Sequence, residues 1–133
     1  MLRFNSPLHR CFLRVRILWE LTRYDFTFAC VGMRAVRSRR KSETRLGFAG
    51  DSPIESAVRE AFKDVAPLYW KPVRCLQRAV VVARVMRHFR IPAEVVIGYR
   101  ARPFFSHAWV EVAGRVVNDS PAYQRRLQVL ERL

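Results

Sequence analysis

The sequence predicts an α+β fold in which a central helix that begins at Cys75 packs on a small antiparallel sheet. Apolar residues of the segment 75–90 fall on one side of a helix at about 100° per residue. These residues are Ala79, Val82, Met86 and Phe89. Residues 93–100 and 106–112 are short segments rich in β-branched side chains, and a loop with Pro103 separates them. Such segments are typical of neighbouring strands.

The N-terminal segment 8–36 is expected to be helical and amphipathic. Apolar side chains recur here every three or four positions, at Phe12, at Val15, and at the neighbours Leu18 and Trp19. Arginines occupy other positions. This spacing favours a helix that packs on the core. A basic amphipathic helix also binds membrane surfaces, so a peripheral membrane contact is the alternative interpretation.

A second helix is expected from Pro53 to about Val65, because Asp51 or Ser52 can cap it and Pro53 suits its first position. The arginine-rich run 34–45 in front of it is interpreted as a solvated linker. It is a weak candidate for nucleic-acid binding because no aromatic residues lie between its charges.

Residues Ala113–Gly114 predict a hairpin turn, and two registers are conceivable. A two-residue loop pairs His107 with Ser120, whereas a three-residue loop, Val112–Gly114, pairs His107 with Asp119. Glycine is preferred in the bulge that accompanies the longer loop. The three-residue register is therefore the prediction.

After the hairpin turn, residues 115–118 are expected to return as a strand. Ser120–Pro121 would then begin a short helical tail that contains Leu127, Leu130 and Leu133. The length of 133 residues suits one domain. Within it, residues 1–50 are expected to form a helical, basic segment that packs on a catalytic core of residues 51–133.

Composition sets broad limits on the class of protein. The 25 Lys and Arg residues exceed the 11 Asp and Glu residues, which gives a net charge of +14 and favours acidic partners. Three widely spaced cysteines support neither a disulfide scaffold nor a zinc site, so we expect a reducing, cytoplasmic (bacterial) setting and no metal. Charges interrupt the apolar stretch 11–33, which argues against a membrane span.

Cys75, His107 and Asp119 occur in the order expected of a nucleophile, a base and an orienting carboxylate. A helix N-terminus and a neighbouring imidazole both favour the thiolate, which is the reactive form of cysteine. The imidazole can later protonate a leaving amine, and a carboxylate on its far nitrogen sets its tautomer. Amides at the start of the helix can stabilise a developing oxyanion.

Each of these residues also has a purely structural interpretation. A cysteine at a helix start is usually a small buried hydrophobe, and an aspartate before Ser120–Pro121 can cap a turn. The order and placement of all three residues favour the triad. Cys11, Cys30, His9 and His88 have no comparable arrangement around them.

The stretch from Trp70 to Asp119 resembles the leader peptidases of lasso-peptide biosynthesis, a branch of the transglutaminase-like superfamily. The resemblance is carried by Cys75–Leu76, Arg78–Ala79, Arg90–Ile91–Pro92–Ala93, Val96–Ile97–Gly98, His107–Ala108–Trp109–Val110–Glu111–Val112, Gly114–Arg115–Val116–Val117 and Asp119. The Cys-to-His and His-to-Asp spacings of 32 and 12 agree with it. Arg90 departs from the pattern, because glycine is usual before the Ile-Pro pair.

The resemblance implies a transglutaminase-like, papain-like cysteine peptidase fold and removal of the leader from a ribosomally made lasso precursor peptide. Cys75 would be the nucleophile, His107 the general base and acid, and Asp119 the orienting residue. Trp70, Tyr99 and Trp109 are candidates for contacting substrate, although aromatic residues at such places often belong to the core. The chain resembles a free-standing peptidase that works with a separate leader-recognition protein and a lasso cyclase. No cofactor is expected, because a phosphate-binding glycine loop is missing.

The sequence leaves two alternatives to the peptidase open. The same fold and thioester intermediate would also support acyl transfer to an amine, or deamidation. A basic, non-enzymatic module that binds nucleic acid or membrane is the weaker alternative, because it leaves the order of Cys75, His107 and Asp119 to coincidence.

Overall fold

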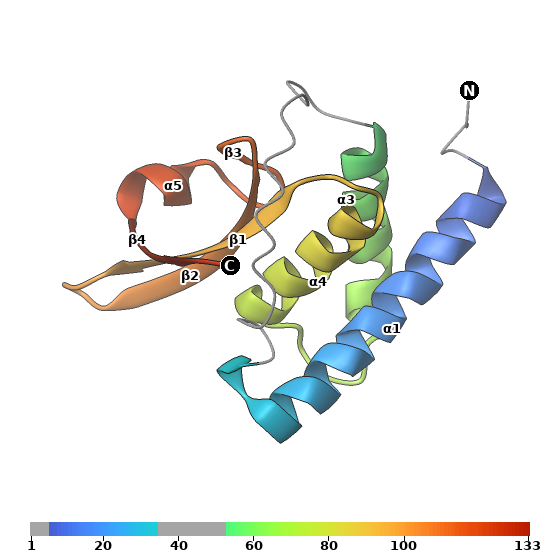
Figure 1. Cartoon of the computed structure of the whole chain (residues 1–133), viewed down its shortest axis with the longest axis horizontal. Helices are drawn as coiled ribbons and strands as arrows, with labels where there is room; N and C mark the ends of the chain where they lie inside the picture. Colours follow the sequence, from blue (N-terminus) through green and yellow to red (C-terminus); the bar gives the residue numbers. More distant parts are fainter. Residues whose placement is uncertain (1–5, 35–52) are drawn as a thin grey trace.

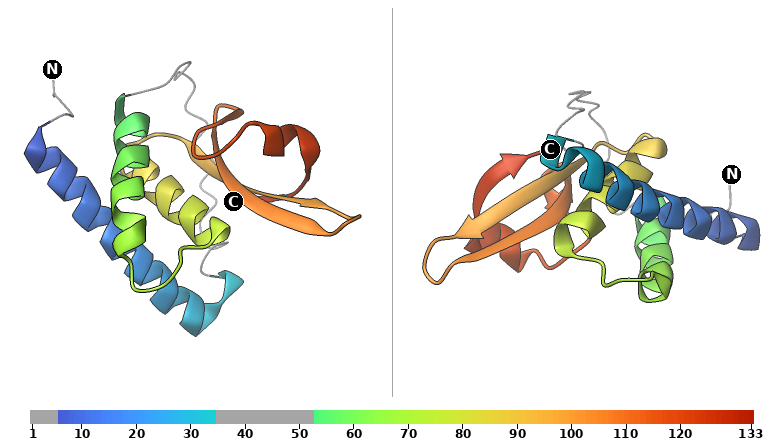
Figure 2. Two further views of the ribbon diagram at one scale, coloured as in Figure 1. Left: turned by 180° about the vertical axis from the view of Figure 1, so that it is seen from behind. Right: turned by 90° about the horizontal axis from the view of Figure 1, so that it is seen from below.

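The computed structural model describes residues 6–34 and 53–133 and has the expected α+β architecture (Figure 1). A layer of three helices, of which one packs directly on the strands, lies on one face of a four-stranded antiparallel sheet, and a short helix lies on the other face (Figure 2). The elements are α1 Pro7–Val31, α3 Pro53–Val65, the 3-10 helix η1 Ala66–Leu68, α4 Cys75–His88, β1 Ala93–Arg100, β2 Phe105–Val112, β3 Arg115–Val116, α5 Ala122–Arg126 and β4 Gln128–Arg132.

Helix α1 begins and ends with ordinary capping signals. The Ser6 side chain accepts a hydrogen bond from the His9 amide (3.4 Å), and Pro7 occupies the first turn. Gly32 stops the helix with φ of 65°, and its amide donates to Phe28 O (2.8 Å). The observed helix is therefore shorter than the predicted helix 8–36. The linker run beyond Arg34 and the capping candidates Asp51 and Ser52 lie outside the described residues.

Helix α4 is the centre of the fold, because it packs against the sheet on one side and against α1 and α3 on the other. Residues on most of its circumference are buried for this reason, including Val80, Val81 and Val85. By helical spacing Gln77 lies opposite Ala79 and Val82, on the side of α4 expected to be polar and exposed, but this expectation is wrong. Gln77 is buried, and its side-chain amide donates to Leu21 O of α1 (3.4 Å).

The sheet has the strand order β3-β2-β1-β4. Strands β1 and β2 pair without interruption from Ala93↔Val112 to Arg100↔Phe105. The C-terminal tail was expected to be helical, but it forms only the short α5 and then β4, which pairs with the other edge of β1. Pairing satisfies backbone groups that the edge of β1 would leave unbonded, and Val95 and Leu133 exchange two such bonds (3.0 and 2.7 Å).

The hairpin between β2 and β3 has the two-residue register, so the three-residue prediction is wrong. Val112 pairs with Arg115 and Glu111 pairs with Val116. Ala113 and Gly114 both have positive φ, 52° and 76°. This combination is the type I′ turn, whose twist matches that of paired strands.

The two faces of the sheet have separate cores. Ala108, Val110 and Val112 of β2 join the large core beneath α4. Trp109 points the other way and forms a smaller core with Val96 and Leu127. Both cores are needed to hold β2, because β2 is buried on both faces along its C-terminal half.

Gly98 of β1 makes room for the Trp109 indole. A Cβ atom at Gly98 would lie 2.5 Å from Trp109 Cη2 and 3.0 Å from Leu127 Cβ. Gly98 is also the strand partner of His107. The close approach of the indole to the β1 backbone therefore occurs directly beside the candidate base.

Candidate active site

His107 and Asp119 form a hydrogen-bonded pair. His107 Nε2 lies 2.7 Å from Asp119 Oδ2, and their side chains are 14% and 21% exposed. His107 lies near the start of β2, on a stretch where β3 does not pair with β2. The pair is thus sheltered from bulk water but open at the edge of the sheet.

Asp119 reaches His107 because the chain leaves the ladder after Val117. The Val117 amide still bonds to Val110 O (3.0 Å), but the Val110 amide donates to the Asn118 side chain instead of a backbone carbonyl (2.7 Å). Arg59 of α3 donates to the released Val117 carbonyl (3.2 Å). These side-chain hydrogen bonds replace the backbone bonds of the ladder, so the chain turns away from β2. Asp119 thereby lies against His107 despite the two-residue register.

The pair determines which nitrogen of the imidazole is available for chemistry. A carboxylate only accepts hydrogen bonds, so His107 Nε2 must be the donor to Asp119. In the neutral ring, Nδ1 is then the acceptor. Asp119 Oδ1 is held in turn by the Ser120 amide (2.8 Å). A nucleophile that His107 activates must therefore approach Nδ1.

Aromatic rings surround the imidazole. The centroid of the Tyr123 ring on α5 lies 4.1 Å from that of His107, and the Phe105 and Trp109 rings stack at 6.2 and 6.5 Å. Tyr123 was not singled out by the sequence. The available signal was its position four residues after Asp119, at the start of a short helix.

Cys75 is the first residue of α4 and is half-buried. No side chain caps this helix, and its first turn has no acidic residue. The first helical bond runs from the Arg78 amide to Arg74 O (2.9 Å), which leaves the preceding amides of the turn without helical partners. Such amides favour negative charge on a thiolate or an oxyanion.

The structure brings together two of the three predicted triad residues. Within residues 6–34 and 53–133, no hydrogen bond joins Cys75 to His107, although α4 packs on β2. Catalytic hydrogen bonds are often long in unliganded enzymes and tighten when substrate binds. The contact between Cys75 and His107 therefore stays a prediction.

A polar cluster fixes the segment that leads into Cys75. The Tyr69 hydroxyl donates to Asp25 of α1, and Lys71 forms an ion pair with the same carboxylate. Burial favours the neutral acid, but hydrogen bonds from Lys71 and Tyr69 outweigh it and hold the pKa of Asp25 below its usual range. Burial, aided by the negative charge of Asp25, raises the pKa of the nearby Tyr24.

The three aromatic residues proposed to contact substrate occupy different environments. Trp70 is 78% exposed, five residues before Cys75, and Lys71 Nζ lies 5.3 Å from its ring centroid. Tyr99 is partly buried on β1 and pairs with Ser106. Trp109 is fully buried and donates from Nε1 to Glu111 Oε1 (2.9 Å). Trp109 is therefore a core residue packed beside His107, and Trp70 is the most exposed of the three. A substrate contact of these residues stays a prediction.

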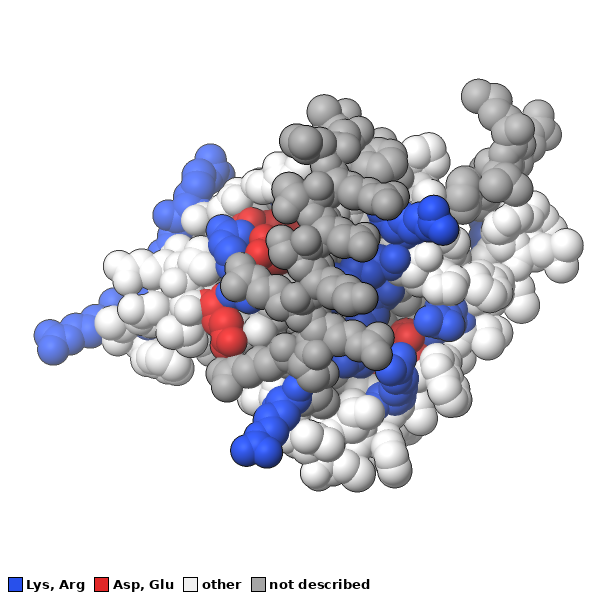
Figure 3. Space-filling view, viewed as in Figure 1, with Lys and Arg blue, Asp and Glu red and all other residues white. Residues whose placement is uncertain are grey.

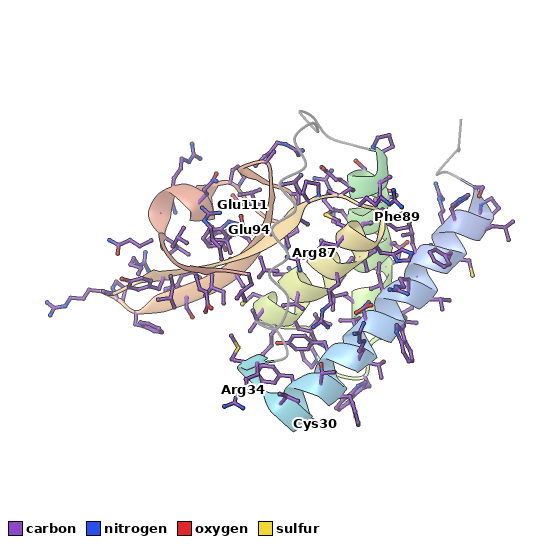
Figure 4. All side chains as sticks on the ribbon, viewed as in Figure 1. Cys30, Arg34, Arg87, Phe89, Glu94 and Glu111 are labelled. Atoms are coloured by element: carbon purple, nitrogen blue, oxygen red, sulfur yellow. The ribbon has the colours of Figure 1, made fainter. Side chains whose placement is uncertain are left out.

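A buried carboxylate, that of Glu111, anchors the C-terminal segment that carries Tyr123. Glu111, which pairs with Glu94 across the sheet (Figure 4), accepts hydrogen bonds from Trp109, Gln124 and Arg132 (2.9, 3.0 and 2.8 Å). The hydrogen bond to Glu111 raises the pKa of Arg132. Glu111 thus ties β2 to both α5 and β4.

The remaining cysteines and histidines stand apart from this arrangement. Cys11 and Cys30 are exposed on α1, and His9 contacts Ser6. His88 lies next to the rings of Phe12 and Phe89. Among residues 6–34 and 53–133, no three histidine, cysteine or acidic side chains converge as a metal site.

The fold and the site define the class of protein. The family model of the transglutaminase-like superfamily matches residues 11–132, so the chain belongs to this superfamily. The chain is also similar to the microcin J25-processing protein McjB of Escherichia coli, with 29% identity over 131 residues. The match covers 95% of this chain but only 62% of McjB. No solved structure matches the chain.

Proposed function

We propose that the chain is a cysteine peptidase that removes the leader from a ribosomally synthesised lasso precursor peptide. The observation that carries this proposal is the His107–Asp119 pair, which leaves Nδ1 as the proton acceptor. Cys75 at the uncapped start of α4 supplies the nucleophile. The similarity to a microcin-processing protein supports a precursor peptide as the substrate.

The proposed reaction proceeds in two steps. His107 Nδ1 takes the thiol proton, and Cys75 Sγ attacks the scissile carbonyl carbon. The carbonyl oxygen becomes negative, and amides of the first turn of α4 stabilise it. The C–N bond then breaks, His107 protonates the leaving amine, and a thioester of the leader remains on Cys75. Water activated by His107 hydrolyses the thioester and releases the leader with a free carboxylate.

A separate leader-recognition protein is proposed to present the precursor, and a cyclase would use the core that is set free. The test combines the full chain, a precursor peptide and its leader-binding protein, and it follows the peptide masses. Two products whose summed mass exceeds that of the precursor by one water molecule support the peptidase. Loss of both products in Cys75→Ala is expected, and cleavage that survives this change would contradict the proposal.

Acyl transfer to an amine is the second candidate, because the superfamily and the thioester would be the same. Adding a small primary amine to the assay separates the two reactions. A leader that carries the amine indicates acyl transfer, whereas a leader with a free carboxylate indicates hydrolysis.

A further inference from the structure

Helix α1 carries an apolar stripe that stays outside the core, although the Phe12 ring approaches that of His88 (6.3 Å between centroids). The stripe consists of residues spaced by three, four or seven positions along its outer face, each between 48% and 81% exposed: Leu8, Phe12, Val15, Trp19 and Phe26. At about 100° per residue they fall within one narrow sector of the helix. An apolar surface of this continuity on a small protein usually marks an interaction site.

The core does not account for this stripe. The opposite face of α1 supplies the core contacts through Leu13, Ile17, Leu21 and Tyr24, which are all buried. α1 is thus apolar on two faces, of which one packs on α3 and α4. The other face is exposed. α1 itself lies on the outside of the helical layer, away from the sheet that carries His107 and Asp119 (Figures 1 and 2).

Arginines border the stripe on the side of α4. Arg16 and Arg23 belong to α1, and both contact buried Glu20, which lies 3.3 and 3.6 Å away. Arg84 of α4 contacts the same Glu20 carboxylate (3.8 Å). Arg87, one turn further along α4, bonds to oxygen atoms of Ala93 and Leu133 (2.8 and 2.9 Å). The same face of the molecule shows a basic band beside α1 (Figure 3).

We propose that the stripe, defined by Leu8, Phe12, Val15, Trp19 and Phe26, binds an anionic lipid surface with α1 parallel to it. Apolar and aromatic side chains would enter the boundary between headgroups and acyl chains, while the arginine border contacts phosphate groups. None of the helices in the described residues is long and apolar enough to span a bilayer. This inference does not depend on the peptidase function.

Charge favours a membrane over a second copy of the chain as the occupant. Two copies that paired through their stripes would bring two arginine borders and two net charges of +14 together, and like charges oppose such contact. Anionic headgroups would instead neutralise the arginine border and the net positive charge of the chain. The charge therefore complements an anionic lipid surface.

The test is sedimentation of the full chain with vesicles of phosphatidylcholine alone or with about one third phosphatidylglycerol. The proposal predicts binding to the anionic vesicles only, and a decrease of about tenfold or more in the double variant Trp19→Gln/Phe26→Gln. The control is Leu68→Gln, because Leu68 is an apolar residue off the stripe that is at least as exposed (80%) as Trp19 and Phe26. This variant should bind as wild type does.

Circular dichroism establishes that each variant is folded, and light scattering measures its oligomeric state. Equal binding of wild type, double variant and control would overturn the proposal. A wild-type dimer that the double variant loses, without lipid binding, would overturn it in favour of an interface between copies.

Discussion

His107 and Asp119 are hydrogen-bonded through Nε2 and Oδ2 at 2.7 Å, although they are not partners in the sheet. The contact depends on Asn118 and Arg59, which take the place of ladder bonds at Val110 and Val117. The carboxylate is thus positioned by the exit of the chain from the sheet. Because Asp119 occupies Nε2 of His107, the reactive thiol has to approach Nδ1.

Replacing the carboxylate with an amide should reduce cleavage and leave the fold intact. Asp119→Asn can still accept from the Ser120 amide, but its amide nitrogen can no longer accept from His107. We expect the single-turnover rate of cleavage to fall by about 10²- to 10⁴-fold. A rate within about twofold of wild type would remove Asp119 from the catalytic apparatus.

The Tyr123 ring should position His107 by packing. Tyr123→Phe keeps the ring that lies 4.1 Å from the imidazole, so its cleavage rate should be close to that of wild type. Tyr123→Ala removes the ring and should lower the rate by about tenfold or more, with a smaller effect on precursor binding. If both variants lose activity equally, the hydroxyl and not the packing is important.

Gly98 should tolerate no side chain. Gly98→Ala forces the buried Trp109 ring or the β1 backbone to move, because the new Cβ would lie 2.5 Å from the indole. Overpacking of this kind costs about 1–3 kcal/mol in the free energy of unfolding, measured by urea denaturation. Gly114→Ala is the comparison, since nothing lies within 4 Å of its Cβ and only its φ of 76° opposes the change. A Gly98→Ala variant as stable as wild type would contradict the packing of Trp109.

Acid should loosen the segment that leads into Cys75. The pKa of Asp25 is lowered in the folded state because the Lys71 and Tyr69 hydrogen bonds outweigh burial. A lowered pKa contributes stability above the unfolded value of about 4, and this stability is lost as the pH falls through the folded value. The free energy of unfolding should therefore decrease below about pH 4.

Asp25→Asn should weaken that acid dependence. Asp64→Asn is the matched control, because Asp64 and its partner Arg14 are both about half exposed and should contribute little. Identical pH profiles for wild type and Asp25→Asn would show that the cluster of Asp25, Tyr69 and Lys71 is not formed.

Arg90 adopts a left-handed conformation, with φ of 63°, where lasso leader peptidases were expected to have glycine. An L-residue is strained there, and the neighbouring bonds from the Arg90 and Ile91 amides to Arg87 O and Met86 O fix the turn. Arg90→Gly should raise the free energy of unfolding by about 1 kcal/mol. Thermal unfolding provides the measurement, and a lower midpoint would contradict the strain.

Much of the fold follows from local patterns in the sequence. The bounds of β1 and the start of α4 agree with the periodicity of residues 93–100 and the placement of Cys75. β4 was missed because its five residues have little alternation and are mostly exposed, so only the open edge of β1 makes them a strand. The burial of Gln77 likewise depends on α1, which lies far from it in the sequence.

In the candidate site, too, some features follow from the sequence and others depend on contacts between distant residues. His107 and Asp119 were paired correctly, but the register given as the reason was wrong. Asn118 and Arg59 achieve the pairing through contacts that no spacing rule predicts. Trp109 has the aromatic character expected of a substrate contact. Because Gly98 on the neighbouring strand has no side chain, the Trp109 ring packs against it and is buried in the smaller core.

The most direct test of the proposed triad is the rate of alkylation of each cysteine by iodoacetamide as a function of pH, mapped by mass spectrometry, in wild type and His107→Ala. Cys11 and Cys30 are exposed on α1 and serve as internal controls. We expect Cys75 alone to react quickly below pH 7, and we expect His107→Ala to abolish this reactivity. Slow reaction of all three cysteines, unchanged in the variant, would contradict an activated nucleophile at Cys75.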